Sequence, residues 1–497
     1  MVQAQEEGQG AVQRGTADPL PDDTEITSLG ALALSAAVKS RRLSSVEVMD
    51  AFLDRIELLN PSVNAIVSLQ PGDQLRRQAQ QRDAQLARGE QCGLLHGLPA
   101  AIKDLEPTDG IRTTLGSPLF RDFVPRTDSI VAERIKRAGA ILIGKTNVPE
   151  FGLGSHTFNP VFGTTLNSYD QSRTAGGSSG GAAVAVALRM LPVADGSDHA
   201  GSLRNPAAFN NVFGFRTSFG RVPADWREVF TPSLSVHGPM ARNLPDLALL
   251  LSVMAGYDAR VPLSNREDPA RFREPLKGEV KGTRLAWLIW AATSHSRREC
   301  SSCAGALRSF EELGCVVEEA RPEYPIDRVW QNWLKLRAWQ VGAFLKEAYA
   351  DPSRRALIKP EAQWEIERGF KVSAYDIADA SAVRSAWYQA VRAMFEKYDF
   401  LILPSAQVFP FDASLRWPRE INGTAMDTYH RWMEVTIPIT MSGCPALNVP
   451  AGFDARGLPM GIQIAGPNHA EMACMQLAYA YDEATRWVAS RPPRLAG

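Results

Sequence analysis

The sequence predicts an α/β fold in which helices cover both faces of a central β-sheet. From residue 95 to 225, short apolar runs alternate with helical segments and glycine-rich turns, which is the pattern of such a core. A hydrophobic content of 45% with 22% charged residues is sufficient for a sizeable core. No internal repeat or linker divides the 497 residues, so we expect one large domain over residues 26–497 after a flexible head of residues 1–25.

Two helices are expected at the start of this domain, within residues 28–66. The second begins at a capping box formed by Ser44 and Glu47, continues through the amphipathic run VMDAFLDRIELL and stops at Asn60-Pro61. Further helices are expected at residues 129–138 and 181–189. Strands are expected in three apolar runs, which are LLHGLPAAIKD (94–104), AGAILIGKT (138–146) and MLPVADGS (190–197).

The C-terminal half contains one irregular segment and then returns to regular elements. Residues 255–282 are rich in proline and charge and are expected to form a surface connection. The next part is helix-rich from 297 to 397, with Trp330, Trp333 and Arg337 on one helical face. Strands are expected in RLAWLIW (284–290), FLILPS (400–405) and LNVPAGF (447–453).

Composition excludes several classes of partner and location. A net charge of −1 gives no reason to expect nucleic acid or an anionic membrane surface as a partner. No apolar run reaches the roughly 18 residues of a membrane span, and the N-terminus lacks a signal core, so we expect a cytoplasmic protein. The six cysteines show no disulfide framework, and Cys300-x-x-Cys303 is interpreted as part of an ordinary helix start, so a reducing compartment is expected.

Three residues in glycine-rich surroundings carry the predicted chemistry. Lys103 ends the apolar run LPAAI, Ser178 lies in GGSSGG (176–181), and Ser202 lies in GSDHAGS (196–202). A serine hydroxyl is a weak nucleophile and needs a base nearby. Lysine serves as that base only when it is neutral, and burial at the end of an apolar strand lowers its pKa. The pattern therefore predicts a serine nucleophile activated by lysine, and hence acyl-transfer chemistry.

The two glycine loops are expected to complete the site. Glycine permits positive φ and close approach of the backbone to a substrate. The helix GAAVAVALRM follows the first loop directly, so the positive end of its dipole would face the site. In the second loop, the amides of His199, Ala200, Gly201 and Ser202 are expected to form an oxyanion hole, in which one donor is typically worth about 10²–10³ in rate.

The chain strongly resembles the amidase signature family over most of its length. The matching stretches are GKTNVPEFG (144–152), RTAGGSSGGAAVAVA (173–187), GSLRNPAAF (201–209), GFRTSFGRVP (214–223), HGPMARNLPDLALLL (237–251) and SGCPALNVPAGFDARGLPMGIQIAGP (442–467). In that family a lysine and the serines of two glycine loops form a Ser–cis-Ser–Lys triad. The resemblance implies that Lys103 is the base, Ser178 the bridging serine and Ser202 the nucleophile. It further implies supporting roles for Ser179, Asp198 and Arg204.

The resemblance also implies an architecture and a set of partners. The fold would have a mixed, mostly twisted sheet, with the signature core at residues 95–225 and variable segments at about 255–435 that shape the substrate cleft. The site would need neither cofactor nor metal, and its partner would be a small-molecule amide. A homodimer is the assembly that the resemblance suggests.

This chain departs from the family at the second loop, where His199-Ala200-Gly201-Ser202 replaces a pattern that usually reads Thr-Gly-Gly-Ser. The Cβ of Ala200 would reshape the oxyanion hole. His199 would line the acyl pocket or orient a water molecule, and both roles stay open. His156, in GSHTFNP, would contact the substrate or hold a loop.

Two literal motif matches are rejected on their context. Gly139 to Thr146 fits the phosphate-loop pattern G-x-x-x-x-G-K-T, but the intervening residues AILI are themselves the strand. Gly176 to Gly180 fits the G-x-S-x-G nucleophile elbow, but the preceding residues SYDQSRTA (168–175) are polar, whereas an elbow follows a buried strand.

These observations predict an amidohydrolase that cleaves a carboxamide through an acyl-Ser202 intermediate. The aromatic residues of the cleft-shaping region favour an aryl or hydrophobic amide, and such a site would extend to esters, carbamates or aryl ureas. These aromatic residues are Phe409, Phe411, Trp417, Tyr429 and Trp432. Two alternatives stay open: a glutaminase-type amidase component of a tRNA-dependent amidotransferase, and a non-catalytic binding protein with the same fold.

Overall fold

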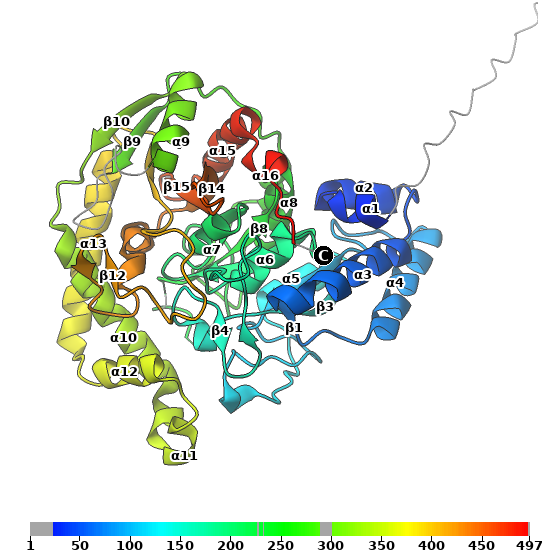
Figure 1. Cartoon of the computed structure of the whole chain (residues 1–497), viewed down its shortest axis with the longest axis horizontal. Coiled ribbons are helices and arrows are strands. Elements are labelled where there is room, and N and C mark those ends of the chain that lie inside the picture. Colours follow the sequence, from blue (N-terminus) through cyan, green and yellow to red (C-terminus); the bar gives the residue numbers. More distant parts are fainter. Residues whose placement is uncertain (1–22, 226–227, 232, 289–300, 496–497) are drawn as a thin grey trace, which may run out of the picture.

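The large sheet of this protein has eight strands and is covered by helices on both faces, as predicted (Figure 1). The computed structural model describes residues 23–225, 228–231, 233–288 and 301–495. The strands, in spatial order, are β10 (Val316–Ala320), β9 (Arg284–Leu288), β11 (Phe400–Pro404), β15 (Pro459–Ala465), β14 (Ala446–Phe453), β7 (Phe213–Arg216), β8 (Val236–Ala241) and β6 (Val193–Asp198). The pairs β10–β9 and β9–β11 are parallel and the other pairs are antiparallel, so the sheet is mixed.

A second, three-stranded sheet stands beside the large one. Its order is β1 (Ile66–Val67), β3 (Ile141–Thr146) and β2 (Pro99–Lys103). Strand β2 contacts β6, the edge strand of the large sheet, and the Lys103 N–H donates to Asp195 Oδ1 at 3.0 Å. Two short hairpins complete the strands: β4 (Phe158–Asn159) with β5 (Gly163–Thr164), and β12 (Glu420–Ile421) with β13 (Thr424–Ala425).

Helices surround both sheets. They are α1 (Asp23–Ser28), α2 (Ala31–Lys39), α3 (Ser45–Val63), α4 (Gly72–Ala87), α5 (Ile130–Arg137), α6 (Gly180–Ala187), α7 (Arg204–Phe209), α8 (Leu244–Met254), α9 (Ser301–Glu312), α10 (Ile326–Ala350), α11 (Pro352–Arg355), α12 (Pro360–Gly369), α13 (Ala374–Met394), α14 (Ile437–Ser442), α15 (Glu471–Thr485) and α16 (Trp487–Ser490). Short 3₁₀ turns occur at Pro118–Phe120, Glu150–Gly152, Pro269–Arg273 and Arg431–Thr436. Figure 1 shows α10 to α13 at the end of the molecule opposite α3 and α4.

The large sheet is buried on both faces, as its strand β9 shows. Leu285 and Trp287 belong to one core cluster, whereas Ala286 and Leu288 belong to another. Successive side chains of a strand point to opposite faces, so each face carries a hydrophobic core of its own. No described helix is both long and apolar enough to cross a membrane.

Several sequence predictions are confirmed and others are corrected. The capping box of Ser44 and Glu47 is present. The helix that follows does not stop at Asn60-Pro61 but continues to Val63 and ends at Asn64, which has a left-handed conformation with φ of 53°. A proline only disfavours the helical conformation of the residue before it, so the helix can continue through Pro61.

Other elements differ from prediction for physical reasons. Strand β10 interrupts the segment expected to be helical. Strands β7, β8 and β15 were not predicted, because strands buried on both faces lack the alternation that marks a strand. Residues 23–25, assigned to the head, lie in α1, and residues 1–22 lie outside the described residues. Cys303 is disulfide-bonded, contrary to the expectation of reduced cysteines, and Cys300 lies outside the described residues.

The contact between α6 and the loop after β3 yields a stability prediction. A Cβ on Gly181 would lie 2.3 Å from the backbone nitrogen of Asn147, whereas a Cβ on Gly305, in helix α9, meets nothing within 4 Å. We expect Gly181→Ala to lower the melting temperature, since overpacking typically costs about 1–3 kcal/mol. Gly305→Ala, the matched control, should leave it unchanged or raise it, because alanine is the better helix former. Equal melting temperatures would show that α6 moves away from the loop without loss of packing.

Candidate active site

Lys103 lies at the end of β2, where a buried strand delivers its side chain to the glycine loops. All five residues of β2 are buried, and Lys103 itself is fully buried. Its Nζ lies 2.8 Å from Ser178 Oγ and 2.8 Å from Ser179 Oγ. Ser197 contributes two further contacts, with its Oγ at 3.0 Å and its carbonyl oxygen at 3.2 Å from Nζ. The structure therefore brings together the lysine and the first serine loop, as predicted.

Burial lowers the pKa of Lys103 to about 7. The carboxylates of Asp195, Glu106 and Asp198 act in the opposite direction and keep the pKa from falling further. A substantial fraction of the amine is consequently neutral near pH 7, which is the state that a general base requires.

The loop that carries Ser178 is buried and is tied to the second serine loop. The Gly177–Ser178 peptide bond is cis, and Ser178 and Ser179 are both buried. Ser179 N–H donates to the carbonyl oxygen of Ser202 at 3.2 Å, which connects the two loops. Helix α6 begins at the next residue, Gly180, and all of its residues are buried, so its N-terminus faces the site as predicted.

The loop that carries Ser202 is organised by Asp198. Its carboxylate accepts hydrogen bonds from the N–H groups of Gly201 (3.0 Å) and Leu203 (3.1 Å). Arg204 binds the same carboxylate with two nitrogens, at 3.0 and 2.9 Å, and Arg216 approaches Oδ1 at 3.2 Å. Burial alone would raise the pKa of Asp198, but the two guanidinium groups outweigh it and hold the pKa below its usual range.

This arrangement changes the predicted oxyanion hole. The Gly201 N–H already donates to Asp198, so it is not available to a substrate oxygen in this structure. His199, Ala200 and Ser202 are the remaining amides of the predicted set. Gly201 itself has a φ of 93°, and a Cβ there would lie 2.8 Å from side-chain atoms of Thr436. Only glycine therefore fits at this position.

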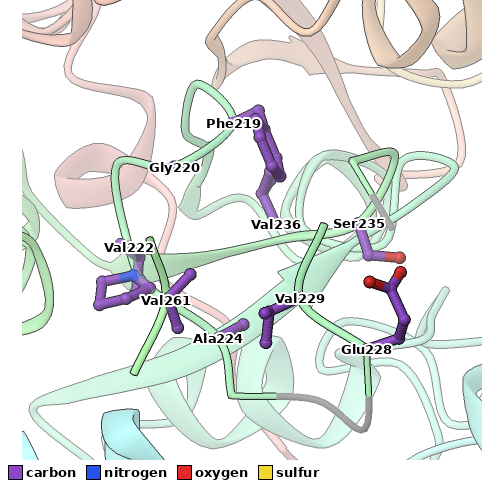
Figure 2. Close-up of a pocket in the computed structure, with 10 residues that line it drawn as sticks. Phe219, Gly220, Val222, Ala224, Glu228, Val229, Ser235, Val236 and Val261 are labelled. Carbon is purple, nitrogen blue, oxygen red and sulfur yellow. The ribbon is translucent and has the colours of Figure 1, made fainter. Parts of the chain in front are cut away.

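The His199 side chain contacts residues outside its own loop. Its Nδ1 lies 2.9 Å from Ser235 Oγ, and Ser235 lines a largely apolar pocket beside β8 (Figure 2). The ring centroid lies 6.1 Å from that of Trp333, one of the buried aromatic residues of α10. Burial lowers the pKa of His199 well below its ordinary value, so the imidazole is neutral.

A second pocket, here called the side pocket, adjoins the Ser178 loop. It is lined by Leu153, Gly154, Ser155, His156, Phe158, Lys359, Glu361, Arg416, Trp417, Tyr429 and Trp432. His156 bonds to protein through both ring nitrogens, to Thr174 Oγ1 at 2.7 Å and to the carbonyl oxygen of Ala413 at 3.0 Å. It thus holds a loop, and it also lines the pocket, while contact with a substrate stays a prediction.

Sequence reasoning missed three residues at the site. Ser197 contacts Lys103, Arg216 completes the charge cluster at Asp198, and Thr436 Oγ1 donates to the carbonyl oxygen of Ala200 at 2.9 Å. Thr436 is distant in sequence and gave no signal. The stretch from Gly139 to Thr146, which was rejected as a phosphate loop, contains strand β3, so the rejection is confirmed. Its Lys145 is buried against Glu106 and Thr108.

Comparison with known proteins identifies the family. The family model described as Amidase matches residues 47–475. The chain belongs to the amidase family. Its members include serine-dependent hydrolases of amides, and this amidase is one of them.

Three relatives show how widely the match extends. The acylamidase of Rhodococcus erythropolis is 34% identical over 93% of this amidase and 97% of that protein. A glutamyl-tRNA(Gln) amidotransferase subunit of Thermosynechococcus vestitus is also 34% identical, over 90% of this chain and 96% of that protein. A crystal structure of a bacterial aryl acylamidase of the amidase signature family superposes with a TM-score of 0.85 at 30% identity, and covers 93% of this chain and 99% of that one.

The charge cluster at Asp198 leads to a second prediction. Arg204→Met would leave a buried carboxylate with one arginine partner, and breaking a buried ion pair typically costs about 3–5 kcal/mol. We expect a large fall in melting temperature. Arg456→Met, which removes an exposed arginine from its pair with Asp454, is the control and should change it little. Similar small effects of both substitutions would mean that Asp198 does not depend on Arg204.

Proposed function

We propose that this amidase hydrolyses carboxamides with an aryl or bulky hydrophobic group through an acyl intermediate on Ser202. The observation that carries this proposal is a fully buried lysine 2.8 Å from the hydroxyl of Ser178 in a loop that is hydrogen-bonded to Ser202. No histidine is needed in this scheme, because burial already brings the lysine pKa to about 7.

In the proposed first step, neutral Lys103 accepts a proton from Ser178 while Ser178 accepts one from Ser202. The Ser202 oxygen attacks the amide carbonyl carbon at the same time, so that a C–O bond forms and the carbonyl oxygen becomes an oxyanion. Ser178 thus relays the proton and needs no change in its own charge.

The oxyanion would be stabilised by backbone amides of the second loop. His199, Ala200 and Ser202 supply the candidate donors, because the Gly201 N–H is bonded to Asp198. Asp198 therefore supports the hole indirectly by fixing the loop. Preorganised amides stabilise the charge without reorganisation during the reaction.

Collapse of the intermediate breaks the C–N bond and forms acyl-Ser202. Protonated Lys103 returns its proton through Ser178 to the leaving nitrogen, which makes the amine a competent leaving group. Water then attacks the acyl-enzyme by the same relay in reverse, releasing the acid and restoring Ser202.

The preference for an aryl or hydrophobic amide is supported by the side pocket. Phe158, Trp417, Tyr429 and Trp432 supply aromatic walls beside the Ser178 loop. Aromatic rings pack in offset or edge-to-face geometry against such walls. The similarity to an acylamidase and to an aryl acylamidase points the same way.

A glutaminase activity is the second candidate, favoured by the equal identity to the glutamyl-tRNA(Gln) amidotransferase protein. It predicts release of ammonia from L-glutamine and a stable complex with partner proteins. The aromatic side pocket argues against a small polar amide as the main substrate. Comparison of ammonia release from L-glutamine and from benzamide separates the two candidates.

The nucleophile can be identified without knowledge of the natural substrate. We expect a small fluorophosphonate to form one adduct on Ser202, located by intact mass and peptide mapping, because only an activated serine reacts readily. Lys103→Ala should abolish the adduct. Lys145→Met is the matched control, since Lys145 is also a buried lysine but lies against Glu106 and Thr108, and it should retain the adduct. An adduct on Ser178 would reverse the proposed order of the two serines.

The pH dependence of kcat/KM tests the base. Protonated Lys103 accepts no proton, so kcat/KM should fall as pH decreases through about 7 and level off above it. Because the carboxylate of Asp195 raises the pKa of Lys103, Asp195→Asn should move the midpoint to lower pH. A profile that stays flat between pH 6 and 8 would contradict the role of Lys103.

A further inference from the structure

The side pocket lies next to the loop that carries Ser178. A Cβ on Gly177 would lie 3.2 Å from the carbonyl carbon of Ser155, and one on Gly152 would lie 3.5 Å from Ser178 Oγ. Residues 153–156, which line the pocket, therefore pack against the loop that carries Ser178. The pocket therefore adjoins the loop whose Ser178 contacts Lys103.

Three hydrogen-bond donors line the pocket from three separate segments. Ser155 Oγ is buried and bonds to no described group, and the same holds for the indole Nε1 of Trp417. Lys359 precedes α12, and its Nζ donates to the carbonyl oxygen of Leu153 at 2.6 Å and lies 5.8 Å from the centre of the Phe158 ring. An ammonium has three donors, so Lys359 can serve a further acceptor.

The carboxylates nearest to Lys359 are engaged elsewhere. Both oxygens of Glu361 bind the guanidinium of Arg416, with Nε to Oε1 at 2.7 Å. Glu150 accepts from Ser117 Oγ at 2.7 Å and from the backbone N–H of Lys359 at 3.2 Å. Among the described residues, Lys359 Nζ forms no ion pair. Burial lowers the pKa of Lys359 to about 8, although the carboxylates of Glu361 and Glu150 act in the opposite direction.

Apart from the Ser155 hydroxyl, which can donate or accept, the acceptors of the described side chains in the lining already have partners. Both nitrogens of His156 are bonded, and the Tyr429 hydroxyl is bonded to Glu365 and Arg337. The ionised side chains of the lining are Lys359, Glu361 and Arg416, so the lining carries a net charge of +1, and Glu150 acts on Lys359 from outside it. Buried polar groups are normally hydrogen-bonded and buried charges are normally paired. A pocket of unpaired donors around one ammonium is thus complementary to an oxyanion.

We propose that the side pocket binds a carboxylate carried by the substrate, so that the substrates of this amidase are amides bearing an aromatic carboxylate. Lys359 supplies the charge, and Ser155 and Trp417 donate to the carboxylate oxygens. The aromatic walls accept the ring that links the carboxylate to the amide. This inference rests on the proposed amide hydrolysis at Ser202.

Pairs of substrates that differ only in charge test the proposal. On the acyl side the pair is 4-carbamoylbenzoate and 4-nitrobenzamide, and on the amine side it is 4-acetamidobenzoate and 4-nitroacetanilide. The nitro group is a neutral isostere of the carboxylate. For at least one pair, we expect kcat/KM to favour the carboxylate about tenfold or more, as charge-assisted hydrogen bonds are the stronger ones.

Variants then assign the preference to the pocket. Lys359→Met should reduce the ratio of kcat/KM values within the favoured pair about tenfold, with most of the loss in KM for the carboxylate and little change for the nitro compound. Lys359→Gln keeps a hydrogen-bond donor near the Leu153 carbonyl, so it removes the charge with less disturbance of the fold. It should reduce the ratio as well. Lys371→Met, at an exposed lysine after α12, is the control and should leave the ratio unchanged.

The outcomes separate this inference from the proposed function. Suppose that both members of a pair are hydrolysed and that Lys359→Met and Lys359→Gln leave the ratio of their kcat/KM values unchanged. This result would overturn carboxylate recognition by the side pocket, while amide hydrolysis stands. Absence of turnover together with absence of a fluorophosphonate adduct on Ser202 would overturn both. A ratio that falls equally in Lys371→Met would show a general effect of surface charge and would also reject the side pocket as the cause.

Discussion

A buried cluster of one carboxylate and two guanidinium groups holds the loop that carries Ser202 against the C-terminal part of the chain. Asp198 ends β6, Arg204 begins α7, and Arg216 ends β7. All three side chains are inaccessible to solvent, and the two arginines outnumber the carboxylate. Arg204 also donates to the Thr436 carbonyl oxygen and to Gln463 Oε1, at 3.0 and 2.6 Å. The loop with Ser202 is therefore fixed by charge pairs and by the C-terminal strands, and not by local turn preference alone.

Lys103, the proposed base, comes from a different sheet than the Ser202 loop, and its position between the two sheets explains its lowered pKa. Lys103 ends a strand of the small sheet, and the Ser202 loop follows the edge strand of the large one. Where the two sheets meet, Lys103 is enclosed by serine side chains and by Asp195. Water is excluded there, so burial dominates the electrostatics and the amine loses much of its preference for a proton.

The sequence could predict those parts of the site that depend on local signals. Lys103, Ser178 and Ser202 lie in short, unusual stretches, and the capping box at Ser44 depends only on neighbouring residues. The hydrogen bond from Gly201 N–H to Asp198 could not be predicted, because the direction of an N–H depends on the folded loop. The sequence indicated the aromatic residues Trp417, Tyr429 and Trp432 but not the pocket that they line, since it is assembled from segments around residues 155, 359 and 417 that carry no common pattern.

The long-range contacts of Arg204 have a consequence for the order in which activity arises during synthesis. Lys103, Ser178 and Ser202 are all made in the first half of the chain. The acceptors of the Arg204 hydrogen bonds, at Thr436 and Gln463, are synthesised much later. Strand β14, which pairs with β7, comes from the same late region. A nascent chain therefore carries all three reactive side chains without the frame that aligns them. On the proposed mechanism, hydrolysis would therefore require the C-terminal region that supplies the two acceptors of Arg204.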